Sequence, residues 1–297
     1  MSFRSRTITR TTKAFKALKR PKNILIRALT FGRAVSKIDR KSTRLNSSHI
    51  TKDTADGPLT YKIIEKNGWK GLFVAITEIL NSFDASSYID YYPSTEKKRA
   101  QLIDELKTVQ EQAHCDLFIV SVHTDEPEYI IKVTENHKAF FRKIIAECKA
   151  DIIWANHPHV VKYFETVEPA DSQTTAQNGR TAFIMYANGN TISAQRTNPQ
   201  FSAPETQRDY TGDGFFIQVK FVKKYNAETQ CYEKCEIEAV NPVLITTYID
   251  RDGDYILKTL NPDLIKTLKR EGDEKWASYL EKRMNLMNDT KGTVLWH

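Results

Sequence analysis

Two histidines flank a proline where an apolar run ends, in the stretch IIWANHPHVV at residues 152–161. The chain has only seven histidines, so the pairing of His157 with His159 is a notable concentration. Imidazole is a common ligand for zinc, iron and manganese-type ions, and it also transfers protons near neutral pH. The pattern leaves three interpretations open: a metal site, a proton-transfer site or a polar loop.

Further polar groups follow apolar runs elsewhere in the chain. His123 ends the run CDLFIVSVH, and Asn188-Gly189-Asn190 follow the run RTAFIMYA. In an open α/β sheet the carboxyl ends of parallel strands meet at one edge, where ligands bind. We therefore predict that His123, His157, His159 and Asn190 lie together at such an edge.

The elements that position these residues follow from hydrophobic periodicity and capping signals. Asn67-Gly68 predicts a type I′ turn between two short strands. The alternation of strand, helix and strand that follows implies parallel strands with right-handed crossovers. The predicted elements are a hairpin of 61–65 and 71–77, helices at 96–113 and 134–150, strands at 115–123 and 151–156, strands at 181–187, 214–223, 231–240 and 242–249, and helices at 261–270 and 273–288.

Other potential ligand groups are assigned no site. His114 precedes a predicted strand and His137 lies on a predicted helix, away from any strand end. Asp250, Asp252 and Asp254 alternate as in a calcium-binding loop, but the closing glutamate of such a loop is absent. We interpret this last stretch as the turn of a hairpin.

The net charge of +7 is unevenly distributed. Residues 1–38 contain eleven Lys or Arg and no acid, and residues 39–51 add a charge of +2. The first 51 residues therefore contribute +13, and residues 52–297 carry −6. A nucleic-acid role argued from overall charge would rest on the leader alone, so we expect no specific nucleic-acid partner. Neither a signal peptide nor a transmembrane run is predicted.

Residues 39–49 read DRKSTRLNSSH, which one frame of a common sequencing-adapter oligonucleotide encodes. We interpret residues 1–51 as a basic leader joined to the gene by sequence assembly, disordered and without an apolar strand pattern. Residues 52–297 are then the folded domain. The alternatives are an ordinary Ser- and Arg-rich linker or, for a genuine leader, a transit peptide or nucleic-acid-binding arm.

Three blocks of the chain read DLFIVSVHTDEPEY, ADIIWANHPHVVKYFE and FIMYANGNTISAQ. In order, they resemble the H-W-G-x-E-Y, G-x-H-P-H-V and Y-S-L-G-N-F blocks of the CapA capsule-synthesis family, also called poly-gamma-glutamate synthesis proteins. The His-Pro-His block is the most specific, and it also resembles the G-H-x-H signature of metallophosphoesterases. The resemblance covers roughly residues 57–250.

The resemblance implies a mixed α/β fold, a metallophosphatase-like layered sandwich with mixed sheets flanked by helices. It also implies a metal-dependent site in which His123, His157 and His159 bind a divalent ion of the Mn, Zn or Fe type, or act as a protonating acid. Either Glu126 or Glu128 takes the place of the family glutamate, and we favour Glu128, which could orient a histidine. Asn190 either contacts substrate or shapes the loop.

Departures from the family pattern put the completeness of this site in doubt. The segment from His123 to Tyr129 has one residue more than the family block, and Ala155 replaces the glycine before His-Pro-His. The family's amino-terminal blocks, a Gly-Asp strand end, an N-x-E block and an Asn-His block, have no counterpart. We therefore expect that the chain is the carboxyl-terminal two-thirds of such a protein, and that it binds at most one ion, weakly, and hydrolyses phosphoesters poorly or not at all.

The function implied by the resemblance is capsule or poly-gamma-glutamate biosynthesis with a metal-dependent hydrolase site. The substrate would be a phosphoester or an anionic polymer, and the partner the capsule-synthesis membrane machinery. Relatives generally work outside the cytoplasm, at the cell surface. The alternative is a non-enzymatic cell-surface protein that handles or anchors polymer and keeps a vestigial site.

Overall fold

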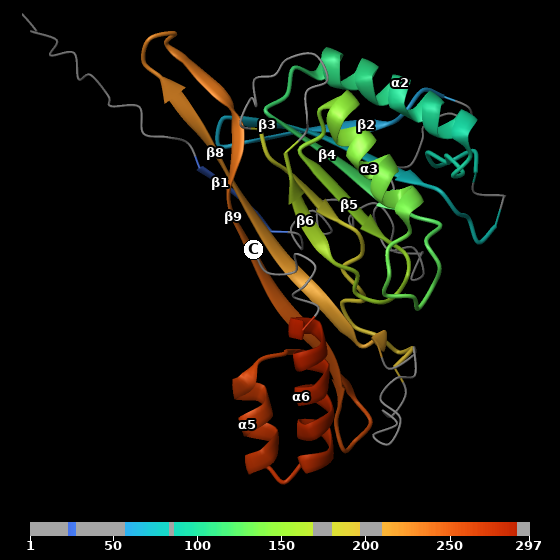
Figure 1. The fold of residues 1–297 in the computed structure, drawn as a ribbon, viewed down its shortest axis with the longest axis vertical. Coiled ribbons are helices and arrows are strands. Elements are labelled where there is room, and N and C mark those ends of the chain that lie inside the picture. Colours follow the sequence, from blue (N-terminus) through green and yellow to red (C-terminus); the bar gives the residue numbers. More distant parts are fainter. Residues whose placement is uncertain (1–22, 28–56, 83–85, 169–179, 197–209, 290–297) are drawn as a thin grey trace, which may run out of the picture.

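The computed structural model describes residues 23–27, 57–82, 86–168, 180–196 and 210–289. Within them the chain forms a six-stranded sheet, a four-stranded sheet and four helices (Figure 1). The strands are β1 (Asn23–Arg27), β2 (Tyr61–Lys66), β3 (Trp69–Thr77), β4 (Leu117–His123), β5 (Ile152–Asn156), β6 (Phe164–Val167), β7 (Ala182–Met185), β8 (Asp213–Asn226), β9 (Cys231–Ile249) and β10 (Tyr255–Thr259), and the helices are α2 (Glu96–Ala113), α3 (Glu135–Cys148), α5 (Pro262–Arg270) and α6 (Glu274–Asp289).

The six-stranded sheet has the order β2-β3-β4-β5-β7-β6. Its four inner strands are parallel, and β2 and β6 pair antiparallel at the two edges. Asn67 and Gly68 have φ of 53° and 76°, which is the backbone that the predicted type I′ turn requires. The predicted hairpin and the parallel strands of the crossover units are therefore confirmed.

Two crossover helices begin where the capping residues predict. The Thr95 side chain accepts from the backbone N–H of Lys98, and the Thr134 side chain accepts from that of His137. Each hydrogen bond satisfies one of the N–H groups that the first helical turn leaves unpaired. Helix α3 ends at Cys148, two residues before the predicted end, because Lys149 adopts the left-handed conformation.

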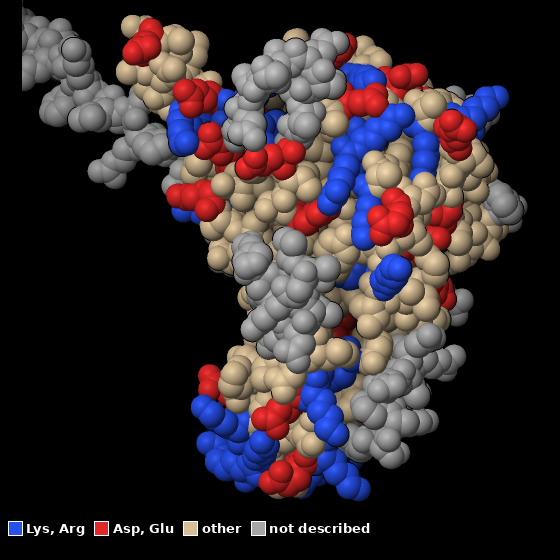
Figure 2. All heavy atoms as spheres, viewed as in Figure 1, with Lys and Arg blue, Asp and Glu red and all other residues tan. Residues whose placement is uncertain are grey.

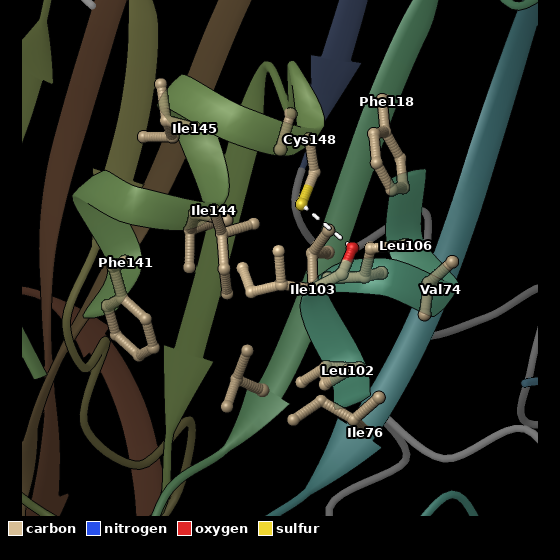
Figure 3. Close-up of a cluster of buried hydrophobic side chains, with 14 of the residues drawn as sticks. Val74, Ile76, Leu102, Ile103, Leu106, Phe118, Phe141, Ile144, Ile145 and Cys148 are labelled. Atoms are coloured by element: carbon tan, nitrogen blue, oxygen red, sulfur yellow. Dashed lines mark hydrogen bonds between the residues drawn. The ribbon is translucent and has the colours of Figure 1, made fainter. Parts of the chain in front are cut away.

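The six-stranded sheet is covered on both faces. Side chains alternate along β3, so this strand contributes to a core on each face. Leu72, Val74 and Ile76 pack beneath α2 and α3, together with the apolar faces of these helices (Figure 3). Phe73 and Ala75 point to the opposite face and join the core shared with the four-stranded sheet. The fold is thus mixed α/β as expected, with a mixed six-stranded sheet flanked by helices.

The four-stranded antiparallel sheet has the order β1-β8-β9-β10, and the long β8–β9 hairpin dominates it. Strand β1 lies in the leader, where no strand was expected. The two strands predicted at 231–240 and 242–249 are one continuous strand, β9, with Pro242 inside it. Proline lacks an N–H, but β10 pairs only with Ile245–Ile249, so β9 has an open edge at Pro242.

The carboxyl-terminal part follows the prediction closely. Helices α5 and α6 pack together at the end of the β8–β9 hairpin remote from its tip (Figure 1). The stretch at 250–254 is the turn between β9 and β10, because Asp250 Oδ1 accepts from the backbone N–H groups of Asp252 and Asp254 at 3.0 and 2.8 Å. Strand β6 was not predicted, and the hairpin interpretation implied β10 without giving its bounds.

The visible surface mixes both signs of charge. Figure 2 shows Lys and Arg next to Asp and Glu over the helices and around the α5–α6 end. Some are paired directly, as in Lys107–Glu147 at 2.6 Å and Lys269–Glu281 at 3.1 Å. Within the described residues, no helix is both long enough and apolar enough to cross a membrane.

Candidate metal centre

The candidate residues are positioned by strands that end level with one another. Thr77 at the end of β3 pairs with His123 at the end of β4, and His123 pairs with Asn156 at the end of β5. Because these strands are parallel, their exit loops leave the sheet at the same edge. The Asn188–Asn190 loop that follows β7 reaches this edge as well, through a bridge between Asn188 and Val161.

The two loops that carry the histidines have unusual backbone conformations. His157, His159 and Tyr129 have φ of 136°, 61° and 63°, a region that side-chain-bearing residues rarely adopt. Each such residue costs on the order of 1–3 kcal/mol and persists only where its surroundings hold it. Here the Tyr129 N–H donates to the Pro158 carbonyl at 2.9 Å, which ties the two loops together.

His123 and His157 are in direct contact. Nε2 of His123 and Nδ1 of His157 lie 3.1 Å apart, and the rings meet edge to face at a centroid distance of 4.8 Å. Burial lowers the pKa of His157, so this imidazole is neutral at neutral pH. Two ligands of a tetrahedral zinc-type ion lie about 3.3 Å apart when each bond is about 2.0–2.1 Å. The pair can therefore share a proton or, after a small adjustment, a cation.

Glu128 and Asn190 complete the group. Glu128 Oε1 lies 3.9 Å from Nε2 of His157 and 4.0 Å from Nε2 of His159, and its side chain is 45% exposed. Asn190 Oδ1 lies 3.1 Å from Nδ1 of His159, on the other side of that ring. All five predicted residues thus form one contiguous chain of contacts from His123 to Asn190. Their roles remain predictions.

The donor set fits one divalent ion of borderline softness, since it offers imidazoles and one accessible carboxylate. The fit is not tight. Among the described residues, the group that brings three ligand atoms within 4.8 Å of one another is a different one, Glu78, Asp125 and His137. His157 and His159, whose ring centroids lie 6.1 Å apart, would have to move closer to share an ion with His123.

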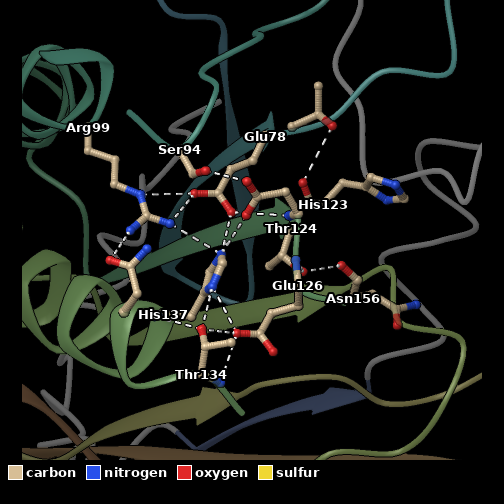
Figure 4. Close-up of polar contacts among 12 residues, drawn as sticks. Glu78, Ser94, Arg99, His123, Thr124, Glu126, Thr134, His137 and Asn156 are labelled. Carbon is tan, nitrogen blue, oxygen red and sulfur yellow. Dashed lines mark hydrogen bonds and ion pairs between the residues drawn. The ribbon is translucent and has the colours of Figure 1, made fainter. Parts of the chain in front are cut away.

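This second group is a buried cluster of ionisable side chains at the same sheet edge (Figure 4). His137 Nε2 lies 2.7 Å from Glu78 Oε2 and 3.1 Å from Asp125 Oδ1. Its Nδ1 lies 2.8 Å from Glu126 Oε1. Glu78 also accepts from Arg99 at 2.8 Å, so the cluster continues into α2. We call this group the His137 cluster, and with Lys162, which pairs with Glu126, its members are Glu78, Arg99, Asp125, Glu126, His137 and Lys162.

The His137 cluster is balanced in charge without a metal ion. Burial disfavours charge on His137, but hydrogen bonds to Asp125, Glu126 and Glu78 outweigh it and raise its pKa to about 10. The ring is therefore an imidazolium that donates from both nitrogens and has no lone pair for a ligand bond. With His137 protonated, three cations balance three carboxylates. A divalent ion would alter that balance and would have to displace a proton from His137, because binding requires a neutral imidazole.

The sequence analysis assigned His137 no role, and the structure gives it one as the centre of this ion cluster. The signal that could have located it is the position of the acids. Glu78 directly follows β3, and Asp125 and Glu126 follow β4, so three carboxylates emerge at one edge. Three acids this close, mostly buried, need cations, and a histidine three residues after the Thr134 cap is well placed to provide one. Of the two candidate glutamates, Glu126 belongs to this cluster and Glu128 lies beside the histidines.

Comparison with known protein families identifies the chain. The sequence model described as "Bacterial capsule synthesis protein PGA_cap" matches residues 41–195, more than half of the chain. The chain belongs to this family of bacterial capsule synthesis proteins. The matched region contains the candidate centre and the His137 cluster, and it begins inside the stretch interpreted as a leader.

Comparison with solved structures gives weak likenesses. A hypothetical protein from Thermus thermophilus has 15% sequence identity and a TM-score of 0.31 over 62% of this chain and 60% of that one. A phosphatase from Mycoplasma pneumoniae has 13% identity and a TM-score of 0.31 over 62% of this chain and 57% of its own. The chain thus spans less than two-thirds of either relative, and neither likeness bears on its function. No curated protein matches it.

Proposed function

We propose that this capsule-synthesis protein has one metal-dependent hydrolytic centre, formed by His123, His157 and His159 with Glu128 beside them. The observation that carries the proposal is the contact between His123 and His157 at 3.1 Å, level with the ends of β4 and β5. It is supported by the strained backbone of His157 and His159, since strain of this kind concentrates at functional sites.

The residues have distinct roles in this proposal. The three imidazoles would hold the ion, and Glu128, which faces two of them, would bind it or orient them. A bound ion of this kind lowers the pKa of its water and polarises a phosphoryl oxygen. Hydrolysis adds water to phosphorus and releases the ester oxygen, which must gain a proton. That proton would come from the attacking water, because the facing nitrogens of His123 and His157, 3.1 Å apart, cannot hold a proton while they hold the ion.

One ion, rather than two, is expected. The second group of ligand atoms within reach of the edge is the His137 cluster, whose carboxylates are already neutralised by His137, Arg99 and Lys162. Two dications about 3.5–4 Å apart repel strongly unless carboxylates offset them. We therefore expect weak binding and slow turnover.

Membership of the family supports a polymer-related substrate. We propose that the substrate is a phosphoester or an amide of an anionic capsule polymer, that the protein works outside the cytoplasm, and that it meets the capsule-synthesis membrane machinery there. Among the five residues of the candidate centre, Glu128 is the acidic one. A bound divalent ion would outweigh its single negative charge, so the centre would attract an anionic substrate.

The test is metal stoichiometry and turnover on the full chain and two variants. Zinc and manganese binding would be measured by calorimetry, and hydrolysis with a chromogenic phosphodiester. His157→Gln should weaken binding at least tenfold and abolish turnover, whereas His114→Asn, on an exposed histidine at the end of α2, should change neither.

Two results would contradict the proposal. Two tightly held ions per chain would mean that the His137 cluster, or other residues, build the site. Unchanged metal affinity in His157→Gln would exclude the histidine centre. Polymer binding that chelators leave unaffected, without turnover, would instead favour a non-enzymatic protein that handles or anchors polymer.

A further inference from the structure

The loop that carries Asn190 is packed backbone to backbone against the start of β8. Gly189 forms a bridge with Gly214, and the Phe215 N–H donates to the Asn188 carbonyl at 2.8 Å. A Cβ at Gly189, whose φ is 70°, would lie 2.4 Å from the Asp213 carbonyl oxygen. A Cβ at Gly214 would lie 2.4 Å from the Asn190 carbonyl oxygen. Backbone atoms cannot yield as side chains do, so both glycines are required for this approach.

The start of β8 is itself held by a buried ion group. The Asp213 carboxylate is fully buried and accepts from Arg196 at 3.0 Å and from Arg283 of α6 at 2.6 Å. Arg196 also donates to the Thr247 carbonyl at 2.9 Å and to the Tyr279 hydroxyl of α6 at 3.3 Å. A Cβ at Gly212 would overlap this guanidinium at 1.9 Å, so residue 212 must be glycine.

This arrangement fixes which way the Asn190 amide faces. Its Nδ2 lies 3.1 Å from the Thr211 carbonyl, 3.3 Å from the His159 carbonyl and 3.3 Å from Ser193 Oγ. Two of these partners can only accept, so the position must be occupied by the NH₂ group. The Oδ1 atom then faces His159 and accepts from its Nδ1 at 3.1 Å. His159 therefore carries a proton on Nδ1, and Nε2, which keeps its lone pair in the neutral ring, lies 4.0 Å from Glu128 Oε1.

We propose that Asp213, which pairs with Arg196 and Arg283, is a positioning residue that sets the tautomer of His159 through Asn190. The Asp213 carboxylate holds the backbone at 211–214 in place. This backbone supplies the Thr211 carbonyl that accepts from Asn190, and it is the surface against which Gly189 packs. A histidine can bind a metal through Nε2 only when its proton is on Nδ1, and an acceptor for the Nδ1–H group fixes the proton there. Helix α6, which supplies Arg283, thus helps to orient the His159 ring through Asp213 and the start of β8.

The last link, from tautomer to metal affinity, rests on the proposed function, whereas the tautomer itself does not. The experiment therefore measures the His159 tautomer and the zinc affinity separately, both on the full chain. The ¹⁵N chemical shifts of the His159 ring report the tautomer in metal-free protein, and zinc affinity reports the ligand. The variants are Arg283→Lys, which keeps the charge but loses the fork geometry, and Gly189→Ala, which pushes the loop off β8 without touching the ion group.

Both variants should convert the single Nδ1–H tautomer of His159 into a mixture and weaken zinc binding about tenfold. The matched control is Arg142→Lys on α3, which alters an ion pair with Glu165 of β6 and should leave both readouts unchanged. An unaltered His159 tautomer in both folded variants would overturn the inference. Altered tautomers in a protein whose wild type binds no zinc would support the positioning role and overturn the metal proposal instead.

Discussion

Two groups of ionisable side chains lie at the same edge of the six-stranded sheet, and they are built differently. In the His137 cluster, every imidazole nitrogen and most carboxylate oxygens have a charged partner at 2.7–3.2 Å, and the side chains of Glu78, Glu126 and His137 are at most 4% exposed. In the candidate centre, two imidazoles touch, Glu128 lies 3.9 Å away or more, and the backbone is strained.

This difference separates stability from function. A saturated, charge-balanced cluster has nothing left to offer a ligand, and it stabilises the fold only as long as all of its members are present. A loosely connected group of histidines contributes little to stability and leaves ring nitrogens available to a ligand. Substitutions of the same type in the two groups should therefore have opposite consequences.

The largest effect is expected from Glu78→Ala in the His137 cluster. The Glu78 side chain, 1% exposed, accepts from Arg99 and His137, so its loss leaves the buried cluster with one more cation than carboxylates and Arg99 without its carboxylate partner. Breaking a buried ion pair in this way costs about 3–5 kcal/mol of unfolding free energy. Chemical denaturation would measure it, and a loss below about 1 kcal/mol would show that the cluster is not a structural core.

The pH dependence of stability should follow His137. Its pKa is about 10 in the folded protein and about 6.5 in an unfolded chain. The stabilisation is therefore complete below about pH 6.5 and is lost as the pH rises toward 10, a decline of a few kcal/mol. Denaturation midpoints measured from pH 6 to 10 would reveal it, and His137→Gln should remove this decline.

Glu126 should make the stability fall at acidic pH, in the opposite direction to His137. Burial raises its pKa, but hydrogen bonds from His137, Lys162 and Thr134 outweigh this and lower it to about 2. Its contribution is present above the unfolded value near 4.5 and lost as the pH falls toward 2. Stability should thus be maximal between about pH 5 and 6.5, and a maximum at pH 8 or above would contradict the assignment of both groups.

The sequence predicted the scaffold better than the clusters. Periodicity and caps located both crossover helices, and strand ends placed His123, His157, His159 and Asn190 at one edge, because period and parallel pairing are local signals. The His137 cluster was not predicted because it joins groups far apart in sequence, such as Glu78 at a strand end and His137 on a helix 59 residues later. Strand β6 was not predicted, and β10 was given no bounds, because four or five residues give no distinct period. That residues 52–297 fold without the leader stays a prediction.

A smaller effect is expected from His157→Gly in the candidate centre. At φ of 136° any side chain is strained, and glycine is not, so stability should stay level or rise by about 1 kcal/mol. Zinc affinity should nevertheless fall at least tenfold. His114→Gly is the matched control, since His114 has φ of 45° and ends α2 away from the site, so it should relieve strain and leave zinc binding unchanged. Destabilisation by more than about 2 kcal/mol would place His157 with the structural residues.

The smallest effect on stability is expected from Glu128→Gln, and it is the sharpest comparison when paired with Glu126→Gln. The two glutamates are two residues apart, yet one faces His157 and His159 from a 45% exposed side chain and the other is buried against His137 and Lys162. Glu128→Gln should change the unfolding free energy by less than about 0.5 kcal/mol, because exposed pairs at this distance contribute little. It should still weaken zinc binding, since it removes the carboxylate that lies within 4.0 Å of both His157 and His159. Glu126→Gln should cost several times more stability, because it leaves Lys162 buried beside a neutral amide. If the two variants lost equal stability, the division between a structural cluster and a functional one at this sheet edge would be wrong.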